Sequence, residues 1–265
     1  MTSMSKVNIV RVDVSAKTAQ KKTDYVAEEK PLHVFLNRTH FVTIFCSPSN
    51  RKELAVGNAI TEGILKSTEE IEGINLKQKE GICRINVRPD VKLKERLNLS
   101  QHFSRVIFSA CGSRTPYQPT LGIPKIQSAL KVKAETVLNC VNRLNFTAET
   151  FRKTGGVHVA AIYEDDGTLV TSAEDVGRHN AVDKAIGTCV LRKFEIGECF
   201  LALSGRLTGD IVYKAARVGL PIAASMAAAI DSGIRVAKDT GLTLVGFARG
   251  KRMNIYTFPQ RILLA

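Results

Sequence analysis

The chain has 265 residues, 44% of them hydrophobic, and a formal net charge of +13 at pH 7. This length allows one large domain, or a domain of ordinary size with a smaller companion, and the apolar fraction is sufficient for a core. No apolar run reaches the roughly 18 residues that a membrane helix needs. The polar start also lacks the apolar core of a signal peptide, so we expect a cytoplasmic protein without a membrane segment.

The positive charge indicates a polyanionic partner, which is a nucleic acid, a phosphorylated small molecule or an acidic protein surface. Aromatic residues make up only 6% of the chain and tryptophan is absent. Few side chains are therefore available to stack on single-stranded bases. A phosphorylated small molecule is favoured, and we expect no nucleic-acid partner.

The first third of the chain predicts a flexible N-terminal arm at residues 1–28, followed by a small α+β domain at residues 29–105. The arm is polar and without clear periodicity. In the domain we expect strands at 32–36 and 41–46, a helix from about 51 to 66, strands near 72–76 and 81–88, and a short helix at 95–104.

Residues 106–125 form a long segment that begins as a strand and continues with small residues and prolines. Loops longer than about 12 residues are usually functional or disordered, so we expect a mobile loop that carries Cys111. Arg114 lies three residues further on and would stabilise a thiolate, the form of cysteine that attacks sulfur or binds metal. The residues alone are equally consistent with a nucleophile and with a bystander.

From residue 126 to 265 the apolar pattern alternates between helix and strand, which predicts a layered α/β domain with a mixed sheet. Helices are expected at 133–144, from about 179, from about 208 and at 230–239, and strands at 157–163, 168–172, 199–203, 221–224, 242–247 and 253–257. None of the six cysteines forms a CxxC pair, so zinc-ribbon and thioredoxin-like sites are excluded. Except for Cys111, the cysteines are expected to be buried apolar residues.

Three polar clusters follow strand-like segments of this domain, which is where α/β folds bind their ligands. The densest cluster runs from Glu174 to Lys184 and places Arg178 and His179 at a strand-to-helix junction, where a helix N-terminus favours phosphate. The alternative is a hydrogen-bonded turn that pins two elements together. His158 enters a strand after two glycines and is expected in the core.

The second cluster contains Ser204 and Arg206 in a glycine turn before a helix, and an ordinary turn is its alternative. The third joins two strands and suits a pyrophosphate clamp, because arginine makes bidentate phosphate contacts and glycine allows close approach. A solvated basic hairpin tip is the alternative. The third cluster consists of Phe247, Ala248, Arg249, Gly250, Lys251 and Arg252.

Together these residues resemble the FdhD/NarQ family of formate dehydrogenase accessory sulfurtransferases. The resemblance covers about residues 28–260, and its most specific part is the Asp-Val-Gly-Arg-His-Asn run. The matching segments are 154–158, 174–180 with Asp183 and Lys184, 204–206, 214–217 and 241–252.

The resemblance implies that a cysteine desulfurase loads Cys111 with sulfur as a persulfide. The sulfur then passes to the molybdenum or tungsten bis(molybdopterin guanine dinucleotide) cofactor, which is cargo for formate dehydrogenase. It further implies that residues 247–252 contact the cofactor, that the larger domain is similar to the cytidine deaminase fold, and that the protein is a homodimer. Arg178, His179, Ser204 and Arg206 are further candidate cofactor contacts.

The chain departs from the family pattern at one place. The family loop is usually Cys-Gly-X-Cys-Gly, and here Arg114 and Thr115 occupy the second cysteine and glycine positions. A persulfide needs only one cysteine, so a single-thiol sulfur carrier is favoured. The alternative is a non-catalytic chaperone that binds and delivers the cofactor. A zinc deaminase is excluded, because the His-X-Glu and Pro-Cys-X-X-Cys motifs are missing.

Overall fold

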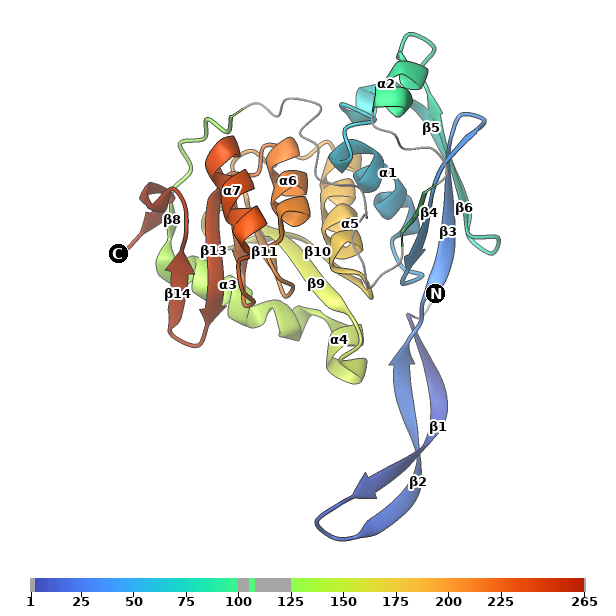
Figure 1. Ribbon diagram of the computed structural model, residues 1–265, viewed down its shortest axis with the longest axis vertical. Coiled ribbons are helices and arrows are strands. Elements are labelled where there is room, and N and C mark those ends of the chain that lie inside the picture. Colours follow the sequence, from blue (N-terminus) through green and yellow to red (C-terminus); the bar gives the residue numbers. More distant parts are fainter. Residues whose placement is uncertain (1–2, 100–104, 108–124, 265) are drawn as a thin grey trace.

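The computed structural model describes residues 3–99, 105–107 and 125–264 (Figure 1). The described part consists of a projecting two-stranded ribbon, a five-stranded sheet with its helices, and a six-stranded sheet with helices on both faces. A mixed α/β fold, as predicted, is therefore confirmed. The similarity to cytidine deaminases stays a prediction.

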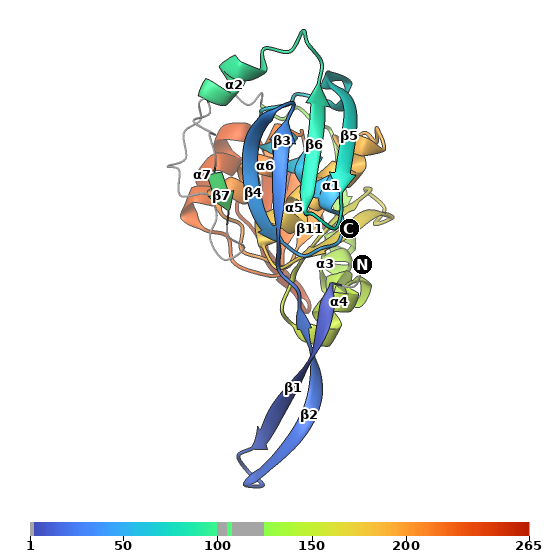
Figure 2. The same ribbon diagram turned by 90° about the vertical axis from the view of Figure 1, so that its right-hand side faces the viewer.

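The N-terminal residues, for which we predicted a flexible arm and no strands, form a two-stranded ribbon. Strands β1 (Met4–Asp13) and β2 (Thr18–Ala27) pair antiparallel over ten residues each. The ribbon extends away from the rest of the molecule in both views (Figures 1 and 2). The sequence pattern failed here because β-branched residues lie on both faces of β1, for example Val7 and Val10, so no period of two marks the strand.

The smaller sheet has the strand order β5-β6-β3-β4-β7. Its strands are β3 (Lys30–Leu36), β4 (Thr39–Cys46), β5 (Ile71–Lys77), β6 (Ile82–Val87) and β7 (Arg105–Ile107), with helices α1 (Arg51–Thr61) and α2 (Leu93–Leu99) and the 3-10 turn η1 (Thr68–Glu70). Helix α1 ends five residues earlier than predicted, because Gly63 adopts a left-handed conformation with φ 77° and closes the helix. A separate hydrophobic cluster lies between α1 and this sheet.

The larger sheet has the order β10-β9-β11-β12-β13-β14, and its parallel pairs are β11–β12 and β12–β13, whereas the other neighbours pair antiparallel. Its strands are β9 (His158–Tyr163), β10 (Leu169–Asp175), β11 (Phe200–Leu203), β12 (Ile222–Ser225), β13 (Thr243–Arg249) and β14 (Arg252–Ile255). Helices α5 (Arg178–Leu191), α6 (Gly209–Arg217) and α7 (Asp231–Thr240) cover one face, and α3 (Ala134–Thr147) with α4 (Glu149–Thr154) covers the other.

The remaining elements are short and were not predicted. They are α4, the parallel pair β8 (Val132–Lys133) and β15 (Ile262–Leu263), η1, and the 3-10 turn η2 (Pro259–Arg261). Elements of two or three residues are too short to show a hydrophobic period, and the six residues of α4 follow α3 almost without interruption.

Helices α1 and α5 touch backbone to backbone where the two sheets' layers meet. A β-carbon on Gly57 would collide with the carbonyl oxygen of Asp183, and one on Gly187 would collide with the carbonyl oxygen of Glu53. Only glycine fits at either position, because any side chain would push the helices apart. The crossing therefore requires a glycine from each helix.

Buried polar groups surround this crossing. The Asp183 carboxylate accepts hydrogen bonds from Asn58 (2.9 Å) and Thr61 (2.7 Å) of α1, and it lies 3.0 Å from the Lys214 ammonium of α6. Burial alone would lower the pKa of Lys214, but the carboxylates of Asp183 and Glu62 outweigh burial and raise it. The lysine stays charged and joins α1, α5 and α6.

Replacing Gly57 with alanine should destabilise the fold by about 2 kcal/mol or more, because the added methyl group has no space between α1 and α5. Urea unfolding of the variant measures the loss. Gly197→Ala is the matched control, since no atom lies within 4 Å of its β-carbon position, and it should change stability by less than about 0.5 kcal/mol. Equal stability of the two variants would contradict the close crossing.

Candidate functional site

Several loops meet at one edge of the larger sheet, which we call the carboxyl edge. The parallel strands β11, β12 and β13 all end there, and the register of β9 and β10 brings His158 and Asp175 to the same edge. We define it by His158, residues 175–179, residues 204–208, residues 225–230 and residues 247–252. All three predicted polar clusters are thus at one end of the sheet.

The loops of the carboxyl edge are hydrogen-bonded to one another. The backbone N–H of Leu207 donates to the carbonyl of Ala228 (3.0 Å), and the N–H of Phe247 donates to the carbonyl of Ala227 (2.9 Å). The Ser225 hydroxyl donates to the carbonyl of Gly205 (2.6 Å). The edge is therefore a connected surface.

Ser204 and Arg206 have different places in this surface. The Ser204 hydroxyl accepts a hydrogen bond from the N–H of Val159 (3.0 Å) and lies 3.5 Å from Nδ1 of His158. Arg206 is exposed. Ser204 thus ties β9 to the turn after β11, while Arg206 is accessible to an anion. His158, which was expected in the core, is half-buried at this edge.

The Asp175 carboxylate is fully buried and lies 2.6 Å from the Lys184 ammonium, which is also fully buried. It accepts hydrogen bonds from the N–H of Ser47 (3.0 Å), the N–H of Gly177 (2.8 Å) and the amide of Asn180 (2.9 Å). Asp175 and Lys184 are therefore internal, which answers for these two residues the question that the sequence left open. The alternative, a turn that pins two elements, describes them.

Arg178 and His179 are the first two residues of α5. The Arg178 side chain packs against Gly205. Burial, followed by the charge of Arg178, lowers the pKa of His158. His179 is 8% exposed, and its Nε2 atom lies 3.9 Å from the Asp210 carboxylate without a hydrogen bond. Burial, helped by the charges of Lys214 and Arg178, lowers the pKa of His179 to about 3, so the imidazole is neutral.

The turn between β13 and β14 carries the third cluster. Phe247 has a left-handed backbone with φ 52°, and the β13–β14 register shifts between Gly246 and Arg249. Such strain in a non-glycine residue is found preferentially at functional sites. Ala248 is buried, whereas Arg249, Gly250, Lys251 and Arg252 are exposed.

Asn142 of α3 holds the tip of this turn. Its amide donates to the carbonyl of Gly250 (3.1 Å) and accepts from the Gly250 N–H (3.2 Å). The Arg249 guanidinium lies 5.5 Å from the centroid of the Phe247 ring. The sequence analysis did not identify Asn142, because it lies about a hundred residues away and within an ordinary amphipathic helix.

The five cysteines in the described residues are buried and not in disulfides, as predicted. Burial raises the pKa of each thiol, to about 12 for Cys46 and Cys189 and to about 11 for Cys83, Cys140 and Cys199. Such thiols are poor nucleophiles at neutral pH. The predicted nucleophile, Cys111, lies outside the described residues.

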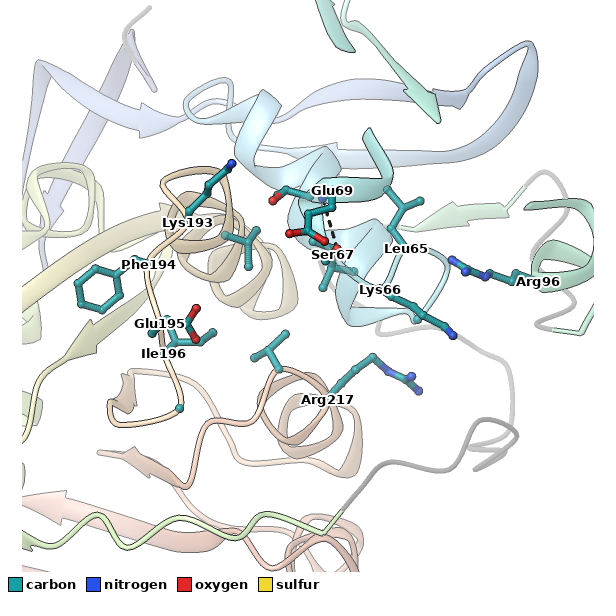
Figure 3. Close-up of a pocket in the computed structure, with 16 residues that line it drawn as sticks. Leu65, Lys66, Ser67, Glu69, Arg96, Lys193, Phe194, Glu195, Ile196 and Arg217 are labelled. Atoms are coloured by element: carbon teal, nitrogen blue, oxygen red, sulfur yellow. Dashed lines mark hydrogen bonds between the residues drawn. The ribbon is translucent and has the colours of Figure 1, made fainter. Parts of the chain in front are cut away.

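A cavity of about 930 Å³ lies at the other end of the helices, between the ends of α1, α5 and α6 (Figure 3). Lys66, Arg96, Lys193 and Arg217 line it among aliphatic residues. Arg96 is neutralised by Glu70, at 2.7 and 2.9 Å. None of the predicted site residues within the described ranges contributes to this cavity. The sequence analysis missed it, because its lining comes from helix ends that are far apart in the chain.

The sequence profile described as the FdhD/NarQ family matches residues 27–263. The chain belongs to the FdhD/NarQ family. Curated relatives named sulfur carrier protein FdhD include those of Bacillus pumilus, 33% identical over 244 residues, and Shouchella clausii, 34% identical over 247 residues. Each match covers 91% of this chain and 91% of the relative.

The fold of this family member also has a solved counterpart. The crystal structure of a protein assigned as a formate dehydrogenase accessory protein in Desulfotalea psychrophila superposes with a TM-score of 0.78. It covers 99% of this chain and 100% of its own, at 24% identity, so it supports the fold alone. No helix in the described ranges is long and apolar enough to cross a bilayer, and no three metal-binding side chains within them cluster.

The neutral His179 predicts a pH dependence of stability. The unfolded chain takes up a proton near the ordinary pKa of 6.5, whereas folded His179 does so only near 3, so stability falls as the pH drops below 6.5. His179→Gln should remove up to about 1.4 kcal/mol of this loss per pH unit. Urea unfolding of both proteins from pH 7 to pH 4.5 measures the slopes. Parallel slopes would contradict a buried neutral imidazole.

Proposed function

We propose that this protein accepts sulfur from a cysteine desulfurase as a persulfide on Cys111 and transfers it to the molybdenum or tungsten bis(molybdopterin guanine dinucleotide) cofactor of formate dehydrogenase. Membership of a family of sulfur carriers in formate dehydrogenase maturation is the starting point. The observation that carries the proposal is the burial and raised pKa of the five other thiols, which leaves Cys111 for the chemistry.

The sulfur step conserves atoms and electrons. The Cys111 thiolate attacks the outer sulfur of the donor's persulfide, the donor's S–S bond breaks, and the donor's cysteine leaves as a thiolate. Cys111 then carries the extra sulfur as its own persulfide. Delivery of that sulfur as a sulfido ligand takes two electrons, which the reduced metal of the cofactor supplies.

The carboxyl edge supports a cofactor with guanine dinucleotide arms as the acceptor. It gathers basic side chains from three loops, and the N-termini of α5 and α6 add partial positive charge. A diphosphate on each arm gives the cofactor several negative charges, which such a surface attracts. The basic residues are Arg178, Arg206, Arg249, Lys251 and Arg252.

The proposal places the cofactor against the β13–β14 turn. The strained backbone of Phe247 and the clamped carbonyl and N–H of Gly250 keep Arg249 and Arg252 on a fixed support. Ala248 is buried and shapes the turn rather than contacting cargo. A cytoplasmic location completes the proposal, together with a homodimer and a cytidine-deaminase-like larger domain, both of which the family resemblance implies.

Incubation with a cysteine desulfurase and cysteine should add one sulfur atom to the wild-type protein and none to Cys111→Ala. Intact-protein mass spectrometry measures the gain, and reductant should reverse it. Cys83→Ala is the matched control and should load like the wild type, because Cys83 is buried. Loss of loading in Cys111→Ala alone would identify Cys111 as the sulfur carrier, although position 114 holds no second cysteine.

The chaperone alternative makes the opposite prediction. If the wild type gains no sulfur while its desulfurase is active, or if Cys111→Ala still supports formate dehydrogenase activation, the protein binds and delivers the cofactor without carrying sulfur. The basic side chains of the carboxyl edge are the observation that supports this second function.

A further inference from the structure

The β1–β2 ribbon has no part in the proposed function, and the family match begins only at residue 27. Nine large apolar side chains are exposed among the described residues, and five of them lie on the ribbon or its turn. They are Val10, Val12, Val14, Tyr25 and Val26. This concentration marks the ribbon as an interaction surface rather than a solvated tail.

The ribbon lacks a core of its own. It is a separate two-stranded sheet, so both of its edges expose unpaired backbone groups. A two-stranded hairpin in water is marginally stable unless it packs on another surface. Beyond its root, the ribbon projects away from the other described elements (Figures 1 and 2), and its two strands are joined by the Arg11–Asp24 ion pair at 3.2 Å.

The root of the ribbon is fixed beside the carboxyl edge. The ammonium groups of Lys6 and Lys153 lie 5.6 and 5.8 Å from the centroid of the Tyr25 ring. Lys153 belongs to α4, whose first N–H groups donate to the Glu174 carboxylate (2.7 Å from Phe151). Glu174 directly precedes Asp175. The ribbon therefore extends past the same end of the sheet to which β11, β12 and β13 point (Figures 1 and 2).

The charge of the ribbon selects the chemistry of its partner. Residues 3–27 contain five basic and two acidic side chains, and the rest of the chain is strongly basic as well. Two ribbons of the same positive charge would repel each other, whereas an acidic protein surface would attract the ribbon. The exposed valines between the lysines suit a protein surface with apolar patches.

We propose that the ribbon docks on an acidic surface of the formate dehydrogenase apoenzyme and aligns the carboxyl edge with it. This inference rests on the proposed function, because the client must approach the edge from which the cargo leaves. The ribbon supplies affinity and orientation, and takes no part in the loading of Cys111.

The test is a charge-reversal triple variant, Lys17→Glu, Lys21→Glu and Lys22→Glu, in the full chain. The matched control reverses three exposed lysines elsewhere, Lys79, Lys94 and Lys238, and so changes the net charge equally. Biolayer interferometry measures affinity for purified apo-formate dehydrogenase from the same organism, at low and high salt. Persulfide loading by the desulfurase is measured in parallel, and light scattering gives the oligomeric state.

The ribbon variant should bind the apoenzyme about ten-fold more weakly at low salt, with a reduced salt dependence, while the control binds like the wild type. Persulfide loading should be equal in all three proteins. Equal affinities, an equal loss in the control, or a change only in self-association would overturn the inference. A wild type that binds the apoenzyme but takes up no sulfur would refute the proposed function and leave the docking role intact.

Discussion

The close contact between α1 and α5 is the constraint on which the rest of the structure depends. Gly57 and Gly187 let the two backbones touch, and the buried Asp183–Lys214 pair fixes α6 beside them. Removal of one partner from a buried ion pair typically costs about 3–5 kcal/mol, because the other charge stays buried without compensation. Since α5 and α6 both begin at the carboxyl edge, this packing also sets where their N-termini face a ligand.

The polar run that begins at the end of β10, residues 174–184, contains side chains with two different structural roles. Asp175 and Lys184 are internal and pin the end of β4 to α5, whereas the Arg178 side chain packs against Gly205 at the carboxyl edge. The basic side chains of the carboxyl edge are thus mounted on a rigid interior. The thiol has the opposite requirement, because a sulfur carrier must reach both a donor and an acceptor.

Much of the fold was predictable from the sequence, because the helices and strands of both sheets have clear apolar periods. The ribbon was not, since Val7 and Val10 lie on opposite faces of β1. The sequence alone also cannot distinguish a charged side chain that faces a ligand from one that is buried in an ion pair. Asp175 is an example, because it is buried beside Lys184. The contribution of Asn142 to the β13–β14 turn depends on tertiary contact alone. Each polar cluster follows a strand, as its sequence indicated, and the strand order brings all three to one end of the sheet.

The most direct test of the central claim follows the sulfur itself. The protein is loaded with ³⁵S through the desulfurase, separated from the donor, and mixed with the cofactor and apo-formate dehydrogenase. The account predicts that the label leaves the protein and appears in the cofactor of active enzyme, and that Arg249→Ala with Arg252→Ala retains the label. Activation of formate dehydrogenase while the label stays on the protein would contradict sulfur transfer and favour a cofactor chaperone.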